Sequence, residues 1–261
     1  MPVPNEQPTI TLPYRLAIVG DYPEQEEINN SSPFVGTAGR MLWGVSSQLG
    51  IMRGACMVGN VCQETPELVK GDFCSMEQQA VFRGKTALAE SLAPAKPNAV
   101  LLVGDLPLKL AGIEHPVSDY RGSIFQCRET SSPLFGFKCV ATVHPRYVMK
   151  NYEMMPMFSM DIRRAKDEAL TSEFTPPPRT LEVELTSQQI IERLDAITPG
   201  TYVSIDIEGG IEQGISCVGV ATSATNAFIV NIRDFTINEQ LRIFPALGRV
   251  LMDASTPKLL Q

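Results

Sequence analysis

The chain has 261 residues, a mean hydropathy near zero and a net charge of −7 at pH 7. This length allows one large domain or two ordinary ones, and 44% hydrophobic residues can form a sizeable core. The acidic balance argues against a protein that coats nucleic acid nonspecifically, although a local basic patch can still contact DNA. No apolar stretch approaches the roughly 18 residues of a membrane-spanning helix, and the polar N-terminus is unlike a signal peptide. We therefore expect a cytoplasmic protein that does not associate with membranes.

The first 170 residues alternate apolar runs with helical patterns. Residues 1–13 are rich in proline and polar residues, which indicates an extended lead-in. Strands are expected at 16–19, 56–61, 98–103 and 138–143, and helices at 37–49, 75–93, 106–110 and 160–170. Because each strand is almost continuously apolar, the pattern predicts a mainly parallel sheet covered by helices on both faces, in an α/β/α arrangement.

A proline-rich segment at 171–180 separates this first domain, 14–170, from a second one at 181–261. Such a segment is stiff and extended, so we place the domain boundary there. In the second domain, helices are expected at 187–197 and 238–252, and strands at 201–207, 215–221 and 227–232. The sequence stops within an apolar stretch that looks like the beginning of a further strand. We therefore expect the chain to be a fragment.

Cysteine spacing gives no sign of a metal site. The six residues form no CxxC pair and no tight cluster (Cys56, Cys62, Cys74, Cys127, Cys139 and Cys217). Ligand and redox cysteines usually occur at short fixed spacings. We interpret these six as reduced, mostly buried thiols.

Polar side chains follow three of the predicted strands of the first domain: Asp21, Asn60 and His144. In a parallel sheet, the carboxyl ends of the strands form the edge where ligands bind. An amide can pair with the edge of a pyrimidine, a nearby aromatic residue such as Phe34 can stack on its face, and an imidazole can donate to an oxygen that gains negative charge. Taken singly, each residue also has a structural explanation as a solvated charge, a turn residue, a hydrogen-bond donor or a core aromatic.

Ordered motifs strengthen the functional interpretation. Residues 20–28 read GDYPEQEEI and residues 33–39 read PFVGTAG; they are followed by Asn60-Val61, LLVG at 101–104, Arg121-Gly122 and HPRY at 144–147. In this order and spacing, residues 16–170 resemble the uracil-DNA glycosylase superfamily, and most of all its family 4. That family's first motif is G-E-[AG]-P-G-x-x-E-D, followed by P-F-V-G-x-A-G. The resemblance implies the superfamily's three-layer fold and hydrolytic excision of uracil from single- or double-stranded DNA.

The resemblance also assigns roles to the matching residues. Phe34 would stack on a flipped uracil and Asn60 would read its Watson–Crick edge. His144 would stabilise the departing uracil anion, and Asp21, in the family's glutamate position, would place or activate the attacking water.

Further residues complete the implied site. Glu27 would lie near uracil C5, where bulk excludes the methyl group of thymine, and Tyr22 belongs to the same uracil-binding set. The implied DNA contacts are Arg121, Arg146 and Lys150, the last two on a loop that family members press into the duplex.

The sequence departs from the family at several positions. Asp21 is one methylene shorter than the usual glutamate, Glu24 occupies a glycine position, and Ile28 replaces an acid. The family's four iron–sulfur cysteines have no counterparts, and Glu64 stands where one is expected, so we expect no cluster. A module that binds uracil or DNA without excising the base is the alternative to an enzyme. An ordinary dinucleotide-binding enzyme is less favoured, because GDYPEQ lacks a glycine-rich phosphate cradle.

In the second domain, Asp206 and Glu208 lie two residues apart on a predicted strand and so point to the same side. Paired carboxylates suit Mg²⁺ or Mn²⁺, although two exposed acids on an edge strand are the plain alternative. The surrounding segment resembles the start of the DnaQ-like 3′–5′ exonuclease domain of family A DNA polymerases, which has a ribonuclease H-like α/β fold. Both acids match its first metal motif, and the remaining metal-binding acids would follow Gln261.

Together the two resemblances imply the N-terminal part of a phage-type DNA polymerase. Such a protein would act in the host cytoplasm and have DNA as its partner. We expect a monomer with an incomplete exonuclease site.

Overall fold

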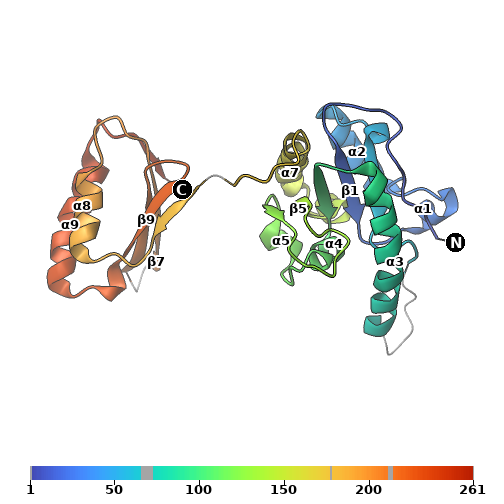
Figure 1. Cartoon of the computed structure of the whole chain (residues 1–261). Helices are drawn as coiled ribbons and strands as arrows, with labels where there is room; N and C mark the ends of the chain where they lie inside the picture. The colour runs from blue at the N-terminus through green and yellow to red at the C-terminus, as the bar shows by residue number, and fades with distance from the viewer. Residues whose placement is uncertain (1, 66–72, 177, 211–213, 261) are drawn as a thin grey trace. The chain divides into compact units, whose positions relative to one another are not determined.

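The computed structural model describes residues 2–65, 73–176, 178–210 and 214–260, and only the backbone of 73–79 and 260. The chain divides into two compact units, Met1–Phe174 and Thr175–Gln261 (Figure 1). Each unit has its own cluster of buried apolar side chains. No helix among the described residues is long and apolar enough to cross a membrane.

A five-stranded sheet in the order β2-β1-β3-β5-β4 forms the centre of the first unit. Its strands are β1 (Leu16–Gly20), β2 (Cys56–Asn60), β3 (Ala99–Val103), β4 (Ile124–Gln126) and β5 (Lys138–Thr142). All pairings are parallel except that of β4, which lies antiparallel to β5 at one edge. Every residue of the four parallel strands is buried, which explains why their sequences are mostly apolar. The predicted, mainly parallel sheet is confirmed.

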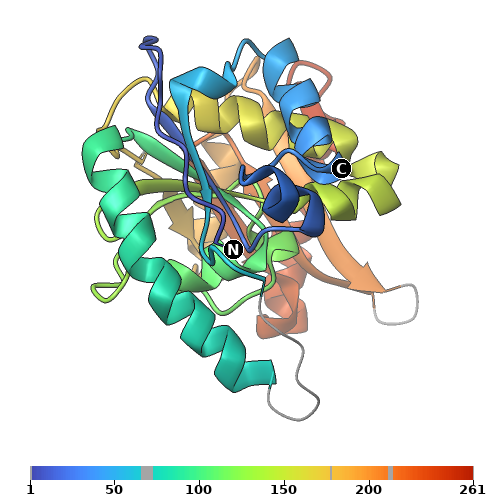
Figure 2. The same ribbon diagram turned by 90° about the vertical axis from the view of Figure 1, so that its right-hand side faces the viewer.

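Helices complete a three-layer α/β/α arrangement around this sheet (Figure 2). They are α1 (Gln25–Asn30), α2 (Thr37–Gln48), α3 (Phe73–Ala95), α4 (Asp105–Leu110), α5 (Val117–Tyr120), α6 (Pro145–Lys150) and α7 (Met155–Glu168), with short 3₁₀ turns η1 (Arg53–Ala55) and η2 (Tyr152–Met154). α7 packs on β3, β5 and α2, whereas α3 packs on β2.

Helices α7 and α3 both extend beyond a predicted boundary. Helix α7 begins five residues before the expected Met160. Helix α3 continues through Pro94 to Ala95 and ends where Lys96 takes a φ of +42°. A proline within the last turn removes only its own N–H bond, so the helix closes slightly later than the proline suggested.

The N-terminal segment runs along the outer edge of β2. Glu6 and Val58 form an antiparallel bridge, and Thr9 N–H donates to the Gly54 carbonyl at 2.7 Å. The Asn5 amide donates to Ser91 Oγ of α3 at 3.0 Å. The segment therefore covers an edge strand whose backbone groups would otherwise lack partners.

The second unit contains another five-stranded sheet, in the order β10-β7-β8-β9-β6. Its elements are β6 (Thr180–Glu182), α8 (Ser187–Asp195), β7 (Val203–Gly210), β8 (Gly214–Ala221), β9 (Asn226–Asn231), the 3₁₀ turn η3 (Ile232–Asp234), α9 (Ile237–Met252) and β10 (Lys258–Leu260). Strands β7, β8 and β9 lie where the sequence predicted three strands, and they form an antiparallel meander. Helices α8 and α9 lie side by side on one face of the sheet, and the second buried cluster fills the space between them and the strands (Figure 1).

Candidate functional site

The end of β1 is where two of the predicted uracil-binding residues meet. A Cβ placed on Gly20 would lie 2.5 Å from Phe34 Cζ and 2.6 Å from Asn60 Oδ1. Gly20 is also paired in register with Asn60 across β1 and β2. The aromatic ring and the carboxamide therefore both lie against the Gly20 backbone, and their residues are only 3% and 5% exposed. The structure brings these two residues together as the motif order predicted.

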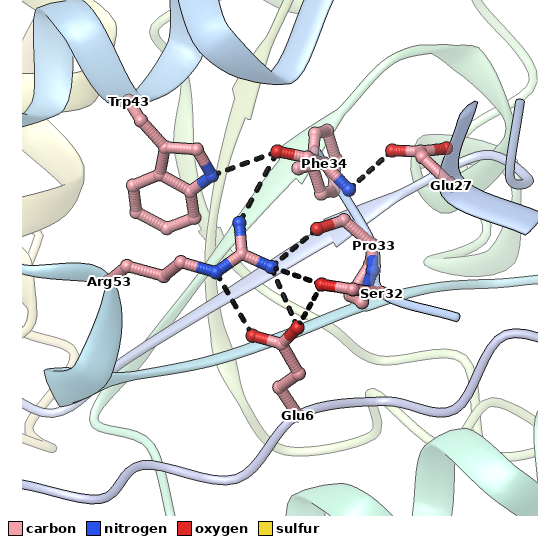
Figure 3. A network of polar contacts seen from close by, with 7 residues as sticks. All are labelled: Glu6, Glu27, Ser32, Pro33, Phe34, Trp43 and Arg53. Carbon is pink, nitrogen blue, oxygen red and sulfur yellow. Dashed lines mark hydrogen bonds and ion pairs between the residues drawn. The ribbon is translucent and has the colours of Figure 1, made fainter. Parts of the chain in front are cut away.

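Phe34 has an unusual backbone conformation, with a φ of +53°. A bulky residue in this left-handed region costs about 1–3 kcal/mol, so its surroundings must hold it there. Its N–H donates to the Glu27 carboxylate, and its carbonyl accepts from Trp43 Nε1 at 3.2 Å and Arg53 Nη1 at 3.3 Å (Figure 3). A side chain on Gly39 would overlap this carbonyl. The second glycine of PFVGTAG thus allows α2 to pass close to the Phe34 backbone.

Glu27 supports this loop from the other side. It is 6% exposed, and its carboxylate accepts from the backbone N–H groups of Glu24, at 2.7 Å, and Phe34. Burial raises the pKa of Glu27, against the lowering effect of these hydrogen bonds. The structure therefore connects Glu27 with the backbone of Phe34. Tyr22, in the loop between β1 and α1, is exposed.

Asp21 lies between β1 and β3, at the first turn of α4. Its Oδ1 accepts from the Leu106 N–H at 2.9 Å. A Cβ on Gly104 would lie 2.6 Å from Asp21 Oδ2, and Gly104 has a φ of +107°. The Asp21 carboxylate thus caps the N-terminus of α4. It belongs to the residue that directly follows Gly20, against which Phe34 and Asn60 lie.

His144 follows β5 and caps α6. Its Nδ1 accepts from the Arg146 N–H at 3.2 Å, which places the proton of the neutral ring on Nε2. Burial and the neighbouring Arg146 lower the pKa of His144 to about 4. The imidazole is therefore a neutral Nε2–H donor at physiological pH.

The segment after His144, expected to be a loop, is helical. Pro145 occupies the first turn of α6, where its missing N–H is tolerated, and Lys150 is exposed at the other end. Arg146 Nε lies 2.6 Å from Glu24 Oε1. This ion pair joins α6 to the loop after β1, so the candidate residues from three motifs form one connected set.

Arg121 has a structural partner. Its Nε donates to Asp161 Oδ2 at 3.0 Å, and the side chains also form an ion pair through Nη2. Asp161 is buried, which raises its pKa even though Arg121 opposes the shift, and it also accepts from Thr142 Oγ1 at 3.0 Å. The Arg-Gly motif is accounted for by this buried contact, because a Cβ on Gly122 would lie 2.8 Å from Asp161 Oδ1.

The described residues do not fit the four-cysteine cluster that family 4 implies. Among them, no group of three or more His, Cys, Asp or Glu side chains could hold a metal ion. Cys56 and Cys139 lie within separate strands, and burial raises the pKa of both thiols. The side chain of Cys74 lies outside the described part. Glu64 forms a 3.6 Å ion pair with Arg83.

In the second unit, Asp206 and Glu208 are exposed and alternate with the inward-facing Ile205 along β7. They pair in register with Gly219 and Cys217 of β8. Both carboxylates therefore share the face opposite the helices, as their spacing predicted.

Sequence reasoning missed Arg53 and Trp43, which donate to the Phe34 carbonyl, and Glu6, which is the ion-pair partner of Arg53 (Figure 3). Arg53 and Glu6 belong to no motif and resemble ordinary surface charges. Trp43 is the single tryptophan of the chain and follows PFVGTAG by four residues, so its position was an available signal.

Comparison with known families identifies the class of protein to which this fold, with Phe34 and Asn60 at Gly20, belongs. The model of the uracil DNA glycosylase superfamily matches residues 9–170, more than half of the chain, and the chain belongs to this superfamily. One relative is the type-4 uracil-DNA glycosylase of Thermotoga maritima. It is 28% identical over 156 residues, which cover 58% of this chain and 76% of that protein.

Proposed function

We propose that the first unit removes uracil from DNA by hydrolysing its N-glycosidic bond. The observation that carries this proposal is the convergence of the Phe34 ring and the Asn60 carboxamide on Gly20. Membership of the superfamily and the neutral state of His144 support it. A flat base with an amide edge suits such a site better than a sugar or a phosphate does.

In the proposed reaction, uracil leaves the base stack and its ring stacks on Phe34. Asn60 pairs with the uracil edge through its amide. As the C1′–N1 bond breaks, the bonding electrons move to the base, and His144 Nε2–H donates to the uracil oxygen that gains negative charge. Asp21 orients a water molecule, whose oxygen bonds to C1′ while its proton passes to the carboxylate. The uracil anion then takes up a proton from solvent and Asp21 returns its proton to solvent, so the products are free uracil and an abasic site.

The remaining residues assist this step. Glu27 acts through the Phe34 N–H that it holds, and Tyr22 contributes to the uracil-binding surface. Arg146 and Lys150, both exposed on α6, contact DNA phosphates.

A single-turnover assay on a uracil-containing oligonucleotide, single- and double-stranded, tests this function. The wild-type protein should release uracil, and Asp21→Ala and His144→Ala should abolish release. Arg15→Met is the matched control, because Arg15 lies at the opposite end of β1 and bonds to Asn98 at 2.7 Å. Absence of uracil release by the wild-type protein would refute the proposal.

A module that binds uracil-containing DNA without excision is the second candidate. The hydrogen bond from Leu106 N–H to Asp21 favours it, because this carboxylate already has a structural task as a helix cap. The same assay separates the two functions. Binding that depends on Phe34 and Asn60, without abasic product, supports the module.

For the second unit, we propose the start of a metal-dependent 3′–5′ exonuclease domain of a phage-type family A DNA polymerase. The exposed pair Asp206 and Glu208 on one face of β7 supports this proposal. Mn²⁺ titration followed by electron paramagnetic resonance should show weak binding, because two carboxylates are half of such a site. Binding should be lost in Asp206→Asn and Glu208→Gln; equal binding by these variants would refute the assignment. An Asn…Asp motif encoded downstream of Gln261 would support the polymerase context.

A further inference from the structure

A polar network centred on Arg53 lies on the carbonyl side of the Phe34 loop (Figure 3). We call it the Arg53 network; it consists of Glu6, Ser32, Pro33, Phe34, Trp43 and Arg53. We propose that Arg53 and Glu6 are positioning residues that fix the Phe34 ring in the orientation that stacks on uracil. This inference rests on the proposed function. It adds Arg53 and Glu6 to the uracil site, although neither residue belongs to a uracil-DNA glycosylase motif.

Each of the three guanidinium nitrogens of Arg53 donates at least one hydrogen bond. It forms a two-point contact with Glu6, with Nε–Oε2 at 3.0 Å and Nη2–Oε1 at 2.8 Å. Nη2 also donates to Ser32 Oγ at 3.2 Å and to the Pro33 carbonyl at 2.5 Å. Nη1 donates to the Phe34 carbonyl at 3.3 Å. The planar Arg53 guanidinium thus connects the carbonyls of Pro33 and Phe34 with the Glu6 carboxylate.

The surroundings limit movement of this fork. The Arg53 guanidinium lies over the Trp43 ring, 5.0 Å from its centroid, in a cation–π contact. The side chains of Arg53 and Glu6 are only 29% and 33% exposed, unlike most surface ion pairs. Glu6 is itself fixed, because it accepts from Ser32 Oγ at 2.5 Å and its backbone pairs with Val58.

The Arg53 network contacts the backbone of Phe34, the residue of the site whose conformation is unfavourable. The φ of +53° at Phe34 is unfavourable for a bulky side chain, and relaxation to an ordinary φ would turn the ring away from Gly20. Glu27 holds the N–H of this residue, whereas Trp43 and Arg53 hold its carbonyl. With both ends of the residue fixed, the ring remains on Gly20 before the base arrives, so binding need not order it.

The geometry also predicts that lysine cannot replace Arg53. An ammonium carries the same charge, but its single nitrogen cannot reach the two Glu6 oxygens and the two carbonyls together. A role in positioning therefore depends on the planar fork, whereas a merely electrostatic role would be preserved by Arg53→Lys.

The first experiment measures single-turnover uracil release and oligonucleotide affinity for Arg53→Met, Arg53→Lys and Glu6→Gln. We expect about tenfold or greater loss of the release rate in both Arg53 variants, and a smaller loss in Glu6→Gln, because small errors in placement have large effects on rate. Arg15→Met, which removes an arginine of the same unit that is hydrogen-bonded at the other end of β1 from Gly20, should stay within about twofold of wild type. Wild-type rates in Arg53→Met and Glu6→Gln would overturn the inference.

A double-mutant cycle tests whether Arg53 acts through Phe34. Phe34→Ala should slow release, and adding Arg53→Met to it should slow release no further, because the ring to be positioned is already absent. Fully additive losses would show that Arg53 acts elsewhere and would overturn the inference.

Trp43 provides a measurement that does not depend on catalysis. As the single tryptophan, it reports on the Arg53 network directly. We expect Arg53→Met and Glu6→Gln to shift its emission and near-ultraviolet circular dichroism while the far-ultraviolet spectrum stays native, and Arg15→Met to shift neither. Unchanged Trp43 spectra would count against the network. If the wild-type protein releases no uracil, the excision proposal fails, and the positioning role is then decided by these spectra and by affinity for uracil-containing DNA.

Discussion

Glu24 and Arg146 form an ion pair in which Oε1 and Nε lie 2.6 Å apart. Glu24 belongs to the loop after β1 and Arg146 to the first turn of α6. Glu24 stands at a position where the resemblance to family 4 implies glycine. If Arg146 binds DNA as proposed, the Glu24 carboxylate competes with DNA phosphates for its guanidinium.

Replacing Glu24 with glutamine should increase affinity for DNA severalfold at low salt. The released Arg146 gains a phosphate contact, so the dependence of log Kd on log salt should steepen by up to about one unit. Fluorescence anisotropy at several salt concentrations measures both quantities. Glu26→Gln is the matched control, because it removes the same charge from α1 but its partner is Arg40, at 3.7 Å. An equal gain in both variants would show only an effect of net charge.

The low pKa of His144 predicts how activity depends on pH. Because the pKa is about 4, Nδ1 stays unprotonated and keeps accepting from the Arg146 N–H down to about pH 5. Its protonation removes this bond, so the ring loses its fixed orientation and uracil release should slow only near pH 4. An acid limb close to pH 6.5, the ordinary value for histidine, would contradict this assignment.

The same shift affects stability. The folded pKa of His144 lies below its unfolded value of about 6.5, so its contribution to stability is fully present above pH 6.5 and is lost as the pH falls toward 4. In His144→Asn, unfolding of the first unit, followed by Trp43 fluorescence, should lose less stability between pH 7 and pH 5 than in wild type. An equal loss in both proteins would argue against a depressed pKa.

Gly39 and Gly44 both lie in α2 and form a matched pair. An alanine Cβ at Gly39 would overlap the Phe34 carbonyl, whereas one at Gly44 meets nothing within 4 Å. Gly39→Ala should destabilise the first unit by about 1–3 kcal/mol or more and slow uracil release. Gly44→Ala should stabilise it by about 0.5–1 kcal/mol, because alanine favours the helix. Urea unfolding monitored by Trp43 gives both values, and similar effects at the two positions would contradict the close approach.

The contact between Arg121 and Asp161 predicts a structural rather than a DNA-binding effect. Arg121→Met leaves a buried carboxylate without its cation and should destabilise the first unit by about 3 kcal/mol. Arg163→Met removes an exposed arginine of α7, the helix that carries Asp161. It should change the free energy of unfolding by less than about 0.5 kcal/mol. A stable Arg121→Met variant with weakened DNA binding would return Arg121 to the DNA-contacting set.

The parts of the fold that the sequence predicted are those whose burial leaves a regular pattern. The four parallel strands are buried throughout, and most of their residues are therefore apolar. The structure also contains α1, β4 and β6, which were not expected. α1 is a six-residue helix with a single apolar side chain, and each of the two strands has three residues at a sheet edge. Such short elements have no period that the sequence can display.

The candidate site divides in the same way. Phe34 and Asn60 were predicted to lie together, because each belongs to a recognisable motif near the end of one of two adjacent strands. The pairing of Arg53 with Glu6 was not predicted, because these two residues are 47 apart in the chain and only the folded sheet edge makes them neighbours. The task of Asp21 as the cap of α4 was equally hidden, because Leu106 is 85 residues away.

The two buried clusters share no side chain among the described residues. A genetic crossover within the proline-rich segment 171–180 would therefore divide neither core. During evolution, the uracil-binding fold could be joined to a different downstream domain in one recombination event, without compensating substitutions inside either core.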